Sequence, residues 1–339
     1  MTRRQFTTMP LLSTALAAAN DIKLGIDLFS VRSQGWTAFE HLDYAAKLGA
    51  RVVHFSEIRF LGSLEDDHVR KVSTHAKKLG IELEIGMRSI CPTSTLFDPK
   101  QGSAEEQLKK VIHAAHLSDS RLVRCFLGSM ADRQGNVPLE THIENTAKTL
   151  RACRSFAQDN NIKIAVENHA GDMQARELRG LIELAGKDFV GAVIDTGNPL
   201  WALEDPHLTL ETLAPYILTS HVRDSYLWKT PEGIAVQWTR MGEGNVDISR
   251  WVARYRELCP GKSLSMEIIV TGSRKFQVFE SKFWDAYRNT PAWEFARFLA
   301  FAEKGNPRPD PPKLDKEASL SKERQDLETS IDFTKKLLA

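Results

Sequence analysis

The chain has few cysteines, almost no net charge and no long apolar run. Its four cysteines include no C-x-x-C pair, which argues against a zinc knuckle. The 45 lysines and arginines nearly balance the 44 aspartates and glutamates. No block of like charge stands out, so neither a nucleic acid nor an anionic membrane is expected as a partner. No segment is apolar over the roughly 20 residues that span a bilayer.

The four cysteines are expected to be mostly buried free thiols. An even count permits disulfides in an exported protein, but Cys125 falls in a strand-like run and Cys153 in a helix-like run. A free cysteine in such a place behaves as a small apolar side chain.

The first 19 residues have the features of an export signal. Arg3 and Arg4 precede a mildly apolar stretch, and Ala17, Ala18 and Ala19 supply small residues for cleavage. This pattern resembles a bacterial twin-arginine signal. It predicts a periplasmic or otherwise exported protein with no membrane attachment once the signal is removed.

From residue 21 to residue 305, short strand-like runs alternate with longer helical patterns. This alternation predicts βαβ units and a parallel sheet. Eight units in about 280 residues favour a single-domain (β/α)8 TIM barrel over an open doubly wound sheet, since such barrels take about 250 residues. The expected strands lie at residues 22–29, 51–56, 81–86, 121–126, 163–167, 189–195, 217–221 and 263–267.

Residues 292–304 are expected to form the eighth barrel helix. A Pro-rich segment then ends the barrel, and residues from about 319 onward have the pattern of an amphipathic helix with charged faces. We expect this C-terminal helix of the segment 306–339 to pack on the barrel exterior or on a second subunit of a homo-oligomer.

Four consecutive late strands end in a potential metal ligand: Glu167, Asp195, His221 and Glu267. The active site of such a barrel lies where the strands end, so three carboxylates and one imidazole should meet at one rim. These ligand types predict one divalent ion and favour Mn²⁺, with Mg²⁺, Co²⁺ and Zn²⁺ as alternatives. Three carboxylates around a dication also call for cationic groups nearby.

Five motifs in this order resemble the sugar isomerase/epimerase branch of the xylose-isomerase-like superfamily. The resemblance covers most of residues 22–304 and implies that Glu167, Asp195, His221 and Glu267 are the metal ligands. The motifs are VENHAGD at 166–172, VIDTGNP at 193–199, SHVRDS at 220–225, MGEGNVD at 241–247 and ME at 266–267.

The resemblance also implies a reaction on a ketose or keto-sugar. The carbonyl and an adjacent hydroxyl would chelate the metal, which acidifies the neighbouring C–H as a Lewis acid. Glu167 and Glu267 match the two glutamates that move the proton in the epimerases of this family. Removal of the proton gives a metal-stabilised enediolate, which is reprotonated on its other face or on the next carbon.

Two further residues follow ligands at a spacing of two. His169 follows Glu167 and is predicted to bind substrate or to act as an acid or base, with a structural role in the loop as the alternative. Arg223 follows His221 and is predicted to hold a substrate hydroxyl or carboxylate, or to offset the negative charge of the site.

Four more residues are candidates for substrate binding. His54 and Arg124 lie near the ends of earlier strands. Trp228 and Trp238 lie in the long connection after the seventh strand, where they could stack on a sugar ring or pack locally.

Other functions stay open at this point. The same site would suit a 3-keto-glycoside lyase that eliminates the aglycone, or a keto-acid dehydratase in which Arg223 meets the carboxylate. A non-catalytic sugar-binding barrel is the alternative from another class. An apurinic endonuclease is disfavoured, because that branch has a histidine where this chain has Asn198.

Overall fold

The computed structural model describes residues 22–339, and their centre is a barrel of eight parallel strands. The sheet order is β10-β1-β2-β3-β4-β5-β6-β7, and its two edges meet where Val222 pairs with Met266. The predicted (β/α)8 barrel is therefore confirmed, and the open sheet is wrong. The strands are β1 (Leu24–Asp27), β2 (Val52–Phe55), β3 (Glu82–Ser89), β4 (Leu122–Phe126), β5 (Lys163–Glu167), β6 (Val190–Asp195), β7 (Ile217–His221) and β10 (Leu264–Met266).

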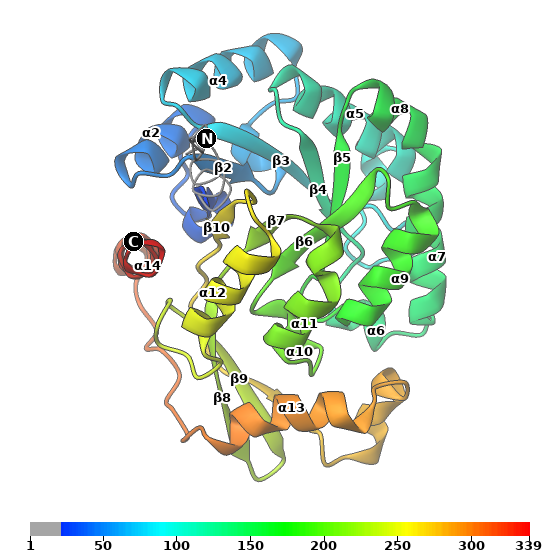
Figure 1. Cartoon of the computed structure of the whole chain (residues 1–339), viewed down its shortest axis with the longest axis vertical. Helices are drawn as coiled ribbons and strands as arrows, with labels where there is room; N and C mark the ends of the chain where they lie inside the picture. The colour runs from blue at the N-terminus through cyan, green and yellow to red at the C-terminus, as the bar shows by residue number, and fades with distance from the viewer. Residues whose placement is uncertain (1–21) are drawn as a thin grey trace, which may run out of the picture.

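Helices surround this barrel (Figure 1). Capping boxes fix the starts of two of them, with Thr37 and Glu40 at α2 and Ser103 and Glu106 at α5. The main helices are α2 (Ala38–Lys47), α4 (Asp66–Lys78), α5 (Ala104–Leu117), α7 (Leu139–Ala152), α8 (Arg154–Asp159), α9 (Ala175–Ala185), α11 (Pro206–Leu213) and α12 (Ile248–Leu258). Short helical turns are η1 (Leu28–Val31), α3 (Ile58–Leu61), η2 (Pro99–Gln101), α6 (Met130–Arg133), α10 (Asn198–Trp201), η3 (Ala214–Tyr216) and η4 (Ser281–Tyr287).

A small antiparallel sheet that the sequence pattern did not indicate is built from two segments, one in the long connection after β7 and one after β10. Strands β8 (Asp224–Thr230) and β9 (Gly233–Thr239) form a hairpin, and β11 (Arg274–Phe276) pairs with β9. Because β8 begins three residues after β7 ends, this sheet lies at the edge of the barrel where the strands end.

Two helices follow β10, and the expectation for the first of them is wrong. Helix α13 (Ala292–Glu303) packs against the hairpin, where Phe298 joins the apolar cluster of Leu227 and Ile234. Helix α14 (Lys316–Leu338) instead packs on η1 and β10 and buries Leu327 and Ile331 in the barrel core. The inserted hairpin gives α13 an apolar face of its own, so α14 completes the helix ring (Figure 1).

Hydrogen bonds tie α14 to the helices on both sides. Tyr44 of α2 donates to Glu328 at 2.8 Å, and Arg256 of α12 donates to the carbonyl of Leu337 at 3.5 Å. The C-terminal helix is therefore on the barrel exterior, as predicted, but as a member of the ring.

Truncation of a buried side chain on α14 tests its place in the core. Leu327→Ala is expected to lower the free energy of unfolding by about 2–5 kcal/mol, because the side chain is fully buried. Gln325→Ala, on the exposed side of the same helix, should stay within about 0.5 kcal/mol of wild type in the same urea titration. Equal stabilities of the two variants would contradict this packing.

The cysteine prediction is confirmed: Cys91, Cys125, Cys153 and Cys259 are all buried and free. Within residues 22–339, no helix has the length and apolar character needed to cross a membrane. The predicted signal at residues 1–19 lies outside the described residues, and export stays a prediction.

Candidate metal centre

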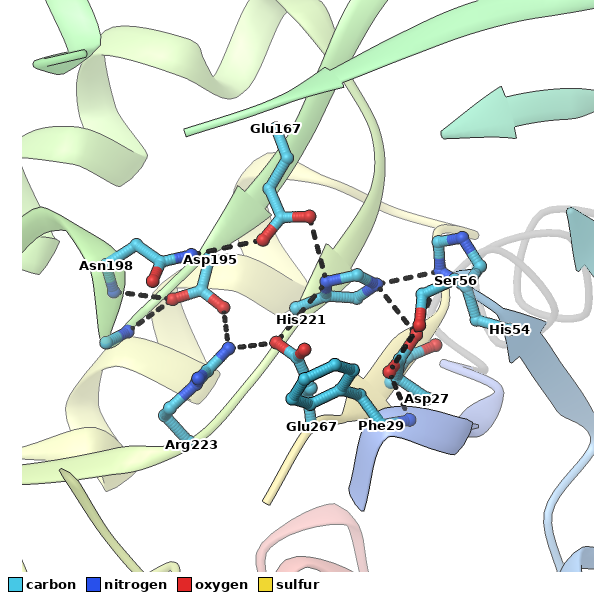
Figure 2. Close-up of polar contacts among 12 residues, drawn as sticks. Asp27, Phe29, His54, Ser56, Glu167, Asp195, Asn198, His221, Arg223 and Glu267 are labelled. Atoms are coloured by element: carbon cyan, nitrogen blue, oxygen red, sulfur yellow. Dashed lines mark hydrogen bonds and ion pairs between the residues drawn. The ribbon is translucent and has the colours of Figure 1, made fainter. Parts of the chain in front are cut away.

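The four predicted ligands meet inside the barrel, at the ends of β5, β6 and β7 and just after β10. One ligand atom from each of Glu167, Asp195, His221 and Glu267 lies within 4.8 Å of the other three, and all four residues are buried. Figure 2 shows the three carboxylates turned toward one another around the His221 ring. The spacing of strand ends in the sequence thus predicts the cluster.

Glu167 is held by Arg124 and Asn198. The Nε of Arg124 donates to one carboxylate oxygen at 2.5 Å, and the amide of Asn198 donates to the other at 3.0 Å. Burial alone would raise the pKa of Glu167, but the charges of Arg124 and His221 outweigh it and hold the pKa well below its ordinary value. Glu167 is therefore kept ionised although it is fully buried.

Arg223 bridges the other two carboxylates. Its guanidinium donates to both Asp195 and Glu267, and its Cζ lies 4.4 Å from the ring centroid of Trp238. Trp238 in turn stacks on Trp201 with centroids 4.0 Å apart. This aromatic support fixes the guanidinium plane between the two ligands, so Trp238 acts on the site through Arg223.

Asp195 and Glu267 differ from Glu167 in their electrostatics. Burial raises the pKa of Glu267 to about 8, against the opposing charges of Arg223 and His221. Burial also raises the pKa of Asp195, although the backbone N–H groups of Gly197 and Asn198 donate to its Oδ1 at 2.7 and 2.6 Å. These two carboxylates take protons more readily than Glu167.

The two ring nitrogens of His221 face different pairs of residues. Its Nδ1 lies 3.3 Å from Glu167 and 3.5 Å from Glu267, whereas its Nε2 lies 2.8 Å from the Nδ1 of His54 and 3.4 Å from Asp27 (Figure 2). Burial lowers its pKa, but Glu167, Asp27 and Glu267 outweigh this and raise it to about 9. A cation at Nδ1 therefore competes with a proton.

Two residues predicted to bind substrate lie behind the ligands instead. His54 is fully buried against His221, and Arg124 is buried against Glu167, with a further donation to the carbonyl of Met87 at 3.1 Å. Both point inward because they occupy inward positions one layer below the strand ends. Each contacts a residue of the cluster, and their binding of substrate stays a prediction.

Two further predicted site residues, His169 and Trp228, lie in different places. His169 is half-buried beside the cluster, where it stacks on Phe126 at 3.8 Å and its Nδ1 lies 2.6 Å from the carbonyl of Gly128. Trp228 is remote: strand alternation puts it on the hairpin face opposite Trp238, packed with Tyr226 and Ala235.

Sequence reasoning missed the group behind His221. Asp27 ends β1, but the predicted strand ran on to residue 29 and placed this aspartate inside it. In the structure Asp27 caps η1 by accepting a hydrogen bond from the N–H of Phe29, and this turn is what ends the strand. An aspartate directly before the short turn Leu28–Val31 was the available signal.

The residues fit a divalent cation. Three carboxylate oxygens and one imidazole nitrogen suit Mn²⁺, Mg²⁺, Co²⁺ or Zn²⁺. Among residues 22–339, the buried Nδ1 of His221 has no hydrogen-bond partner. With the three carboxylates ionised and His221 neutral, as cation binding requires, these residues and the guanidiniums of Arg124 and Arg223 carry one net negative charge, and a dication brings the sum to one net positive charge.

Comparison with known proteins identifies the family. A family model described as a xylose isomerase-like TIM barrel matches residues 42–277, which is more than half of the chain. The chain therefore belongs to the xylose isomerase-like TIM-barrel family, as the motifs suggested.

A 3-oxo-isoapionate decarboxylase from Pectobacterium atrosepticum is 24% identical over 183 residues, which are 54% of this chain and 59% of that protein. The chain thus spans about three fifths of this curated relative.

Solved structures share the fold at low sequence identity. The D-psicose 3-epimerase from Clostridium cellulolyticum H10 has a TM-score of 0.61 at 14% identity, over 94% of this chain and 99% of that one. The 3-keto-D-glucoside 4-epimerase from E. coli has a TM-score of 0.56 at 12% identity, over 81% and 100%. The IolI protein with a bound zinc atom has a TM-score of 0.58 at 13% identity, over 82% and 97%.

Proposed function

We propose that the chain is a divalent-metal-dependent isomerase or epimerase that moves a proton next to the carbonyl of a keto-sugar. The observation that supports this most is the pairing of Glu167 and Glu267. They come from different strands, contact the same nitrogen of His221 from different sides, and are each held by a separate arginine. Two such carboxylates can take a proton from one face of a carbon and return it on another.

The residues of the cluster have distinct roles in this proposal. A cation held by Glu167, Asp195, His221 and Glu267, with Mn²⁺ as the proposed ion, would polarise the substrate carbonyl and acidify the neighbouring C–H. Glu167 removes the proton and Glu267 supplies one, or the reverse, depending on the sugar.

Arg124 and Arg223 stabilise the anion that proton removal creates. They lie against the two acid–base carboxylates and bring positive charge into a buried site, where its effect is strong. His169, half-buried at the edge of the cluster, is proposed to contact a substrate hydroxyl.

A second candidate is the loss of a group near the carbonyl, either CO2 from the adjacent carbon or a leaving group from the carbon after it. The named activity of the curated relative, a 3-oxo-isoapionate decarboxylase, favours it. Elimination of an aglycone from a 3-keto-glycoside, or of water from a keto acid, would begin with the same proton removal by Glu167 or Glu267.

Incubation of the Mn²⁺-loaded protein in D2O separates these functions. Ketoses, 3-keto-glycosides and 3-oxo sugar acids are supplied in turn, and products are followed by NMR and mass spectrometry. Deuterium next to the carbonyl of an intact or isomerised sugar supports the proposal. Release of aglycone, water or CO2 supports the second candidate. Binding of a sugar with neither exchange nor release would contradict both and favour a sugar-binding barrel.

A further inference from the structure

The carboxylate of Asp27 is anchored at one oxygen and unpaired at the other. Its Oδ1 accepts hydrogen bonds from the N–H of Phe29 at 2.8 Å and from the hydroxyl of Ser56 at 2.9 Å. Its Oδ2 has no hydrogen-bond partner within residues 22–339, is fully buried, and lies 3.4 Å from the Nε2 of His221. Capping of η1 accounts for the hydrogen bond from Phe29 to Oδ1, but it gives no reason for the buried, unpaired Oδ2.

The chemistry of imidazole supplies a role for that oxygen. A neutral histidine carries its proton on one nitrogen and a lone pair on the other. The Nδ1 of His221 faces Glu167 and Glu267, so it can bind a cation only if the proton is on Nε2. A buried Nε2–H needs an acceptor, and metal-binding histidines find it in a carboxylate or a carbonyl.

Two groups lie within reach of this nitrogen, and they differ in what they can accept. The Nδ1 of His54, at 2.8 Å, donates or accepts according to its own tautomer. An ionised carboxylate only accepts. Of the two groups, which lie beside the His221 ring in Figure 2, only an ionised Asp27 favours a single tautomer of His221.

We propose that Asp27 is a positioning residue that accepts the Nε2–H of His221 and thereby reserves Nδ1 for the cation. This inference rests on the metal centre of the proposed function, but it does not depend on which reaction follows. Ser56 and the N–H of Phe29 aim the carboxylate by holding its far oxygen. The Nδ1 of His54 also accepts from the Nε2–H of His221 when it carries no proton of its own.

The isosteric variant Asp27→Asn tests this directly. Its amide oxygen can keep the two hydrogen bonds now made by Oδ1, which turns the amide NH2 toward Nε2 of His221. That donor favours the proton on Nδ1, and the affinity of the chelator-stripped protein for Mn²⁺ should fall about 10–100-fold in calorimetric titrations.

A matched control is Glu204→Gln. Glu204 is another buried carboxylate; it accepts hydrogen bonds from the N–H of Ala175 and the hydroxyl of Thr209. These partners lie outside the cluster, so Mn²⁺ affinity should match wild type. If Asp27→Asn does not fold, Ser56→Ala replaces it, because it loosens the same carboxylate and should weaken Mn²⁺ binding to a smaller degree.

NMR of protein labelled with ¹⁵N-histidine gives a readout that a purely structural role would not move. With Zn²⁺ bound, His221 of wild type should carry its proton on Nε2, and the signal is assigned with His221→Asn. Equal Mn²⁺ affinity in wild type and Asp27→Asn, or an unprotonated Nε2 in wild type, would overturn the inference while leaving the metal centre standing. If wild type binds no ion, the metal centre itself fails and the inference fails with it.

Discussion

Glutamine in place of Glu167 or Glu267 is expected to lower kcat by about 10²–10⁴-fold or more while the barrel stays folded. Each change keeps the size of the side chain and removes its ability to take a proton. Both residues lie in the same buried cluster and contact the same imidazole, so neither is expected to substitute for the other. Steady-state kinetics with the substrate found by deuterium exchange, beside circular dichroism, measures both parts.

The control for these variants is Glu204→Gln. Glu204 is also buried, but its carboxylate accepts from the N–H of Ala175 and the hydroxyl of Thr209 at the start of α9, outside the cluster. It tests whether loss of any buried carboxylate lowers the rate. Full activity of Glu167→Gln or Glu267→Gln under metal-replete conditions would remove that residue from the acid–base pair.

Treatment with a chelator is expected to abolish turnover, and added Mn²⁺ to restore it. The same ion should stabilise the fold, because it binds the folded cluster and not the unfolded chain. The gain is about 4 kcal/mol when the free ion is at 1,000 times its Kd. Thermal unfolding with and without Mn²⁺ measures this gain, and His221→Asn, which removes the single nitrogen ligand, should lose most of it.

The outcome for His221→Asn decides what the ion does. A Tm that rises with Mn²⁺ equally in wild type and in this variant would place the ion elsewhere on the protein. Turnover that survives the chelator in wild type would argue for proton transfer without a metal.

The cluster of Glu167, Asp195, His221 and Glu267 could be predicted because each is the last residue of a strand or follows it directly. Strand alternation then decides that these side chains point into the barrel, and the parallel sheet places them at the same rim. The same logic is less precise for residues that lie before the ends of their strands. His54 and Arg124 were expected at the pocket, but their side chains end on His221 and Glu167, since register within a strand cannot be read from its ends alone.

Contacts between distant segments account for the rest. The pattern of residues 224–239 does not distinguish a hairpin from a loop, because the apolar face of the hairpin packs on α13, which is distant in the sequence. Since α13 packs there, the place beside β10 is taken by α14. Asp27 could not be linked to His221 for a similar reason. The two residues lie on β1 and β7, which are far apart in the chain, and only closure of the barrel through β10 brings them together.

The most direct test of the metal centre is the anomalous scattering of Mn²⁺ in crystals of the protein. The prediction is a single peak at about 2.0–2.6 Å from oxygens of Glu167, Asp195 and Glu267 and from Nδ1 of His221. No peak within the cluster at saturating Mn²⁺, or a peak bound through Nε2 of His221, would contradict it.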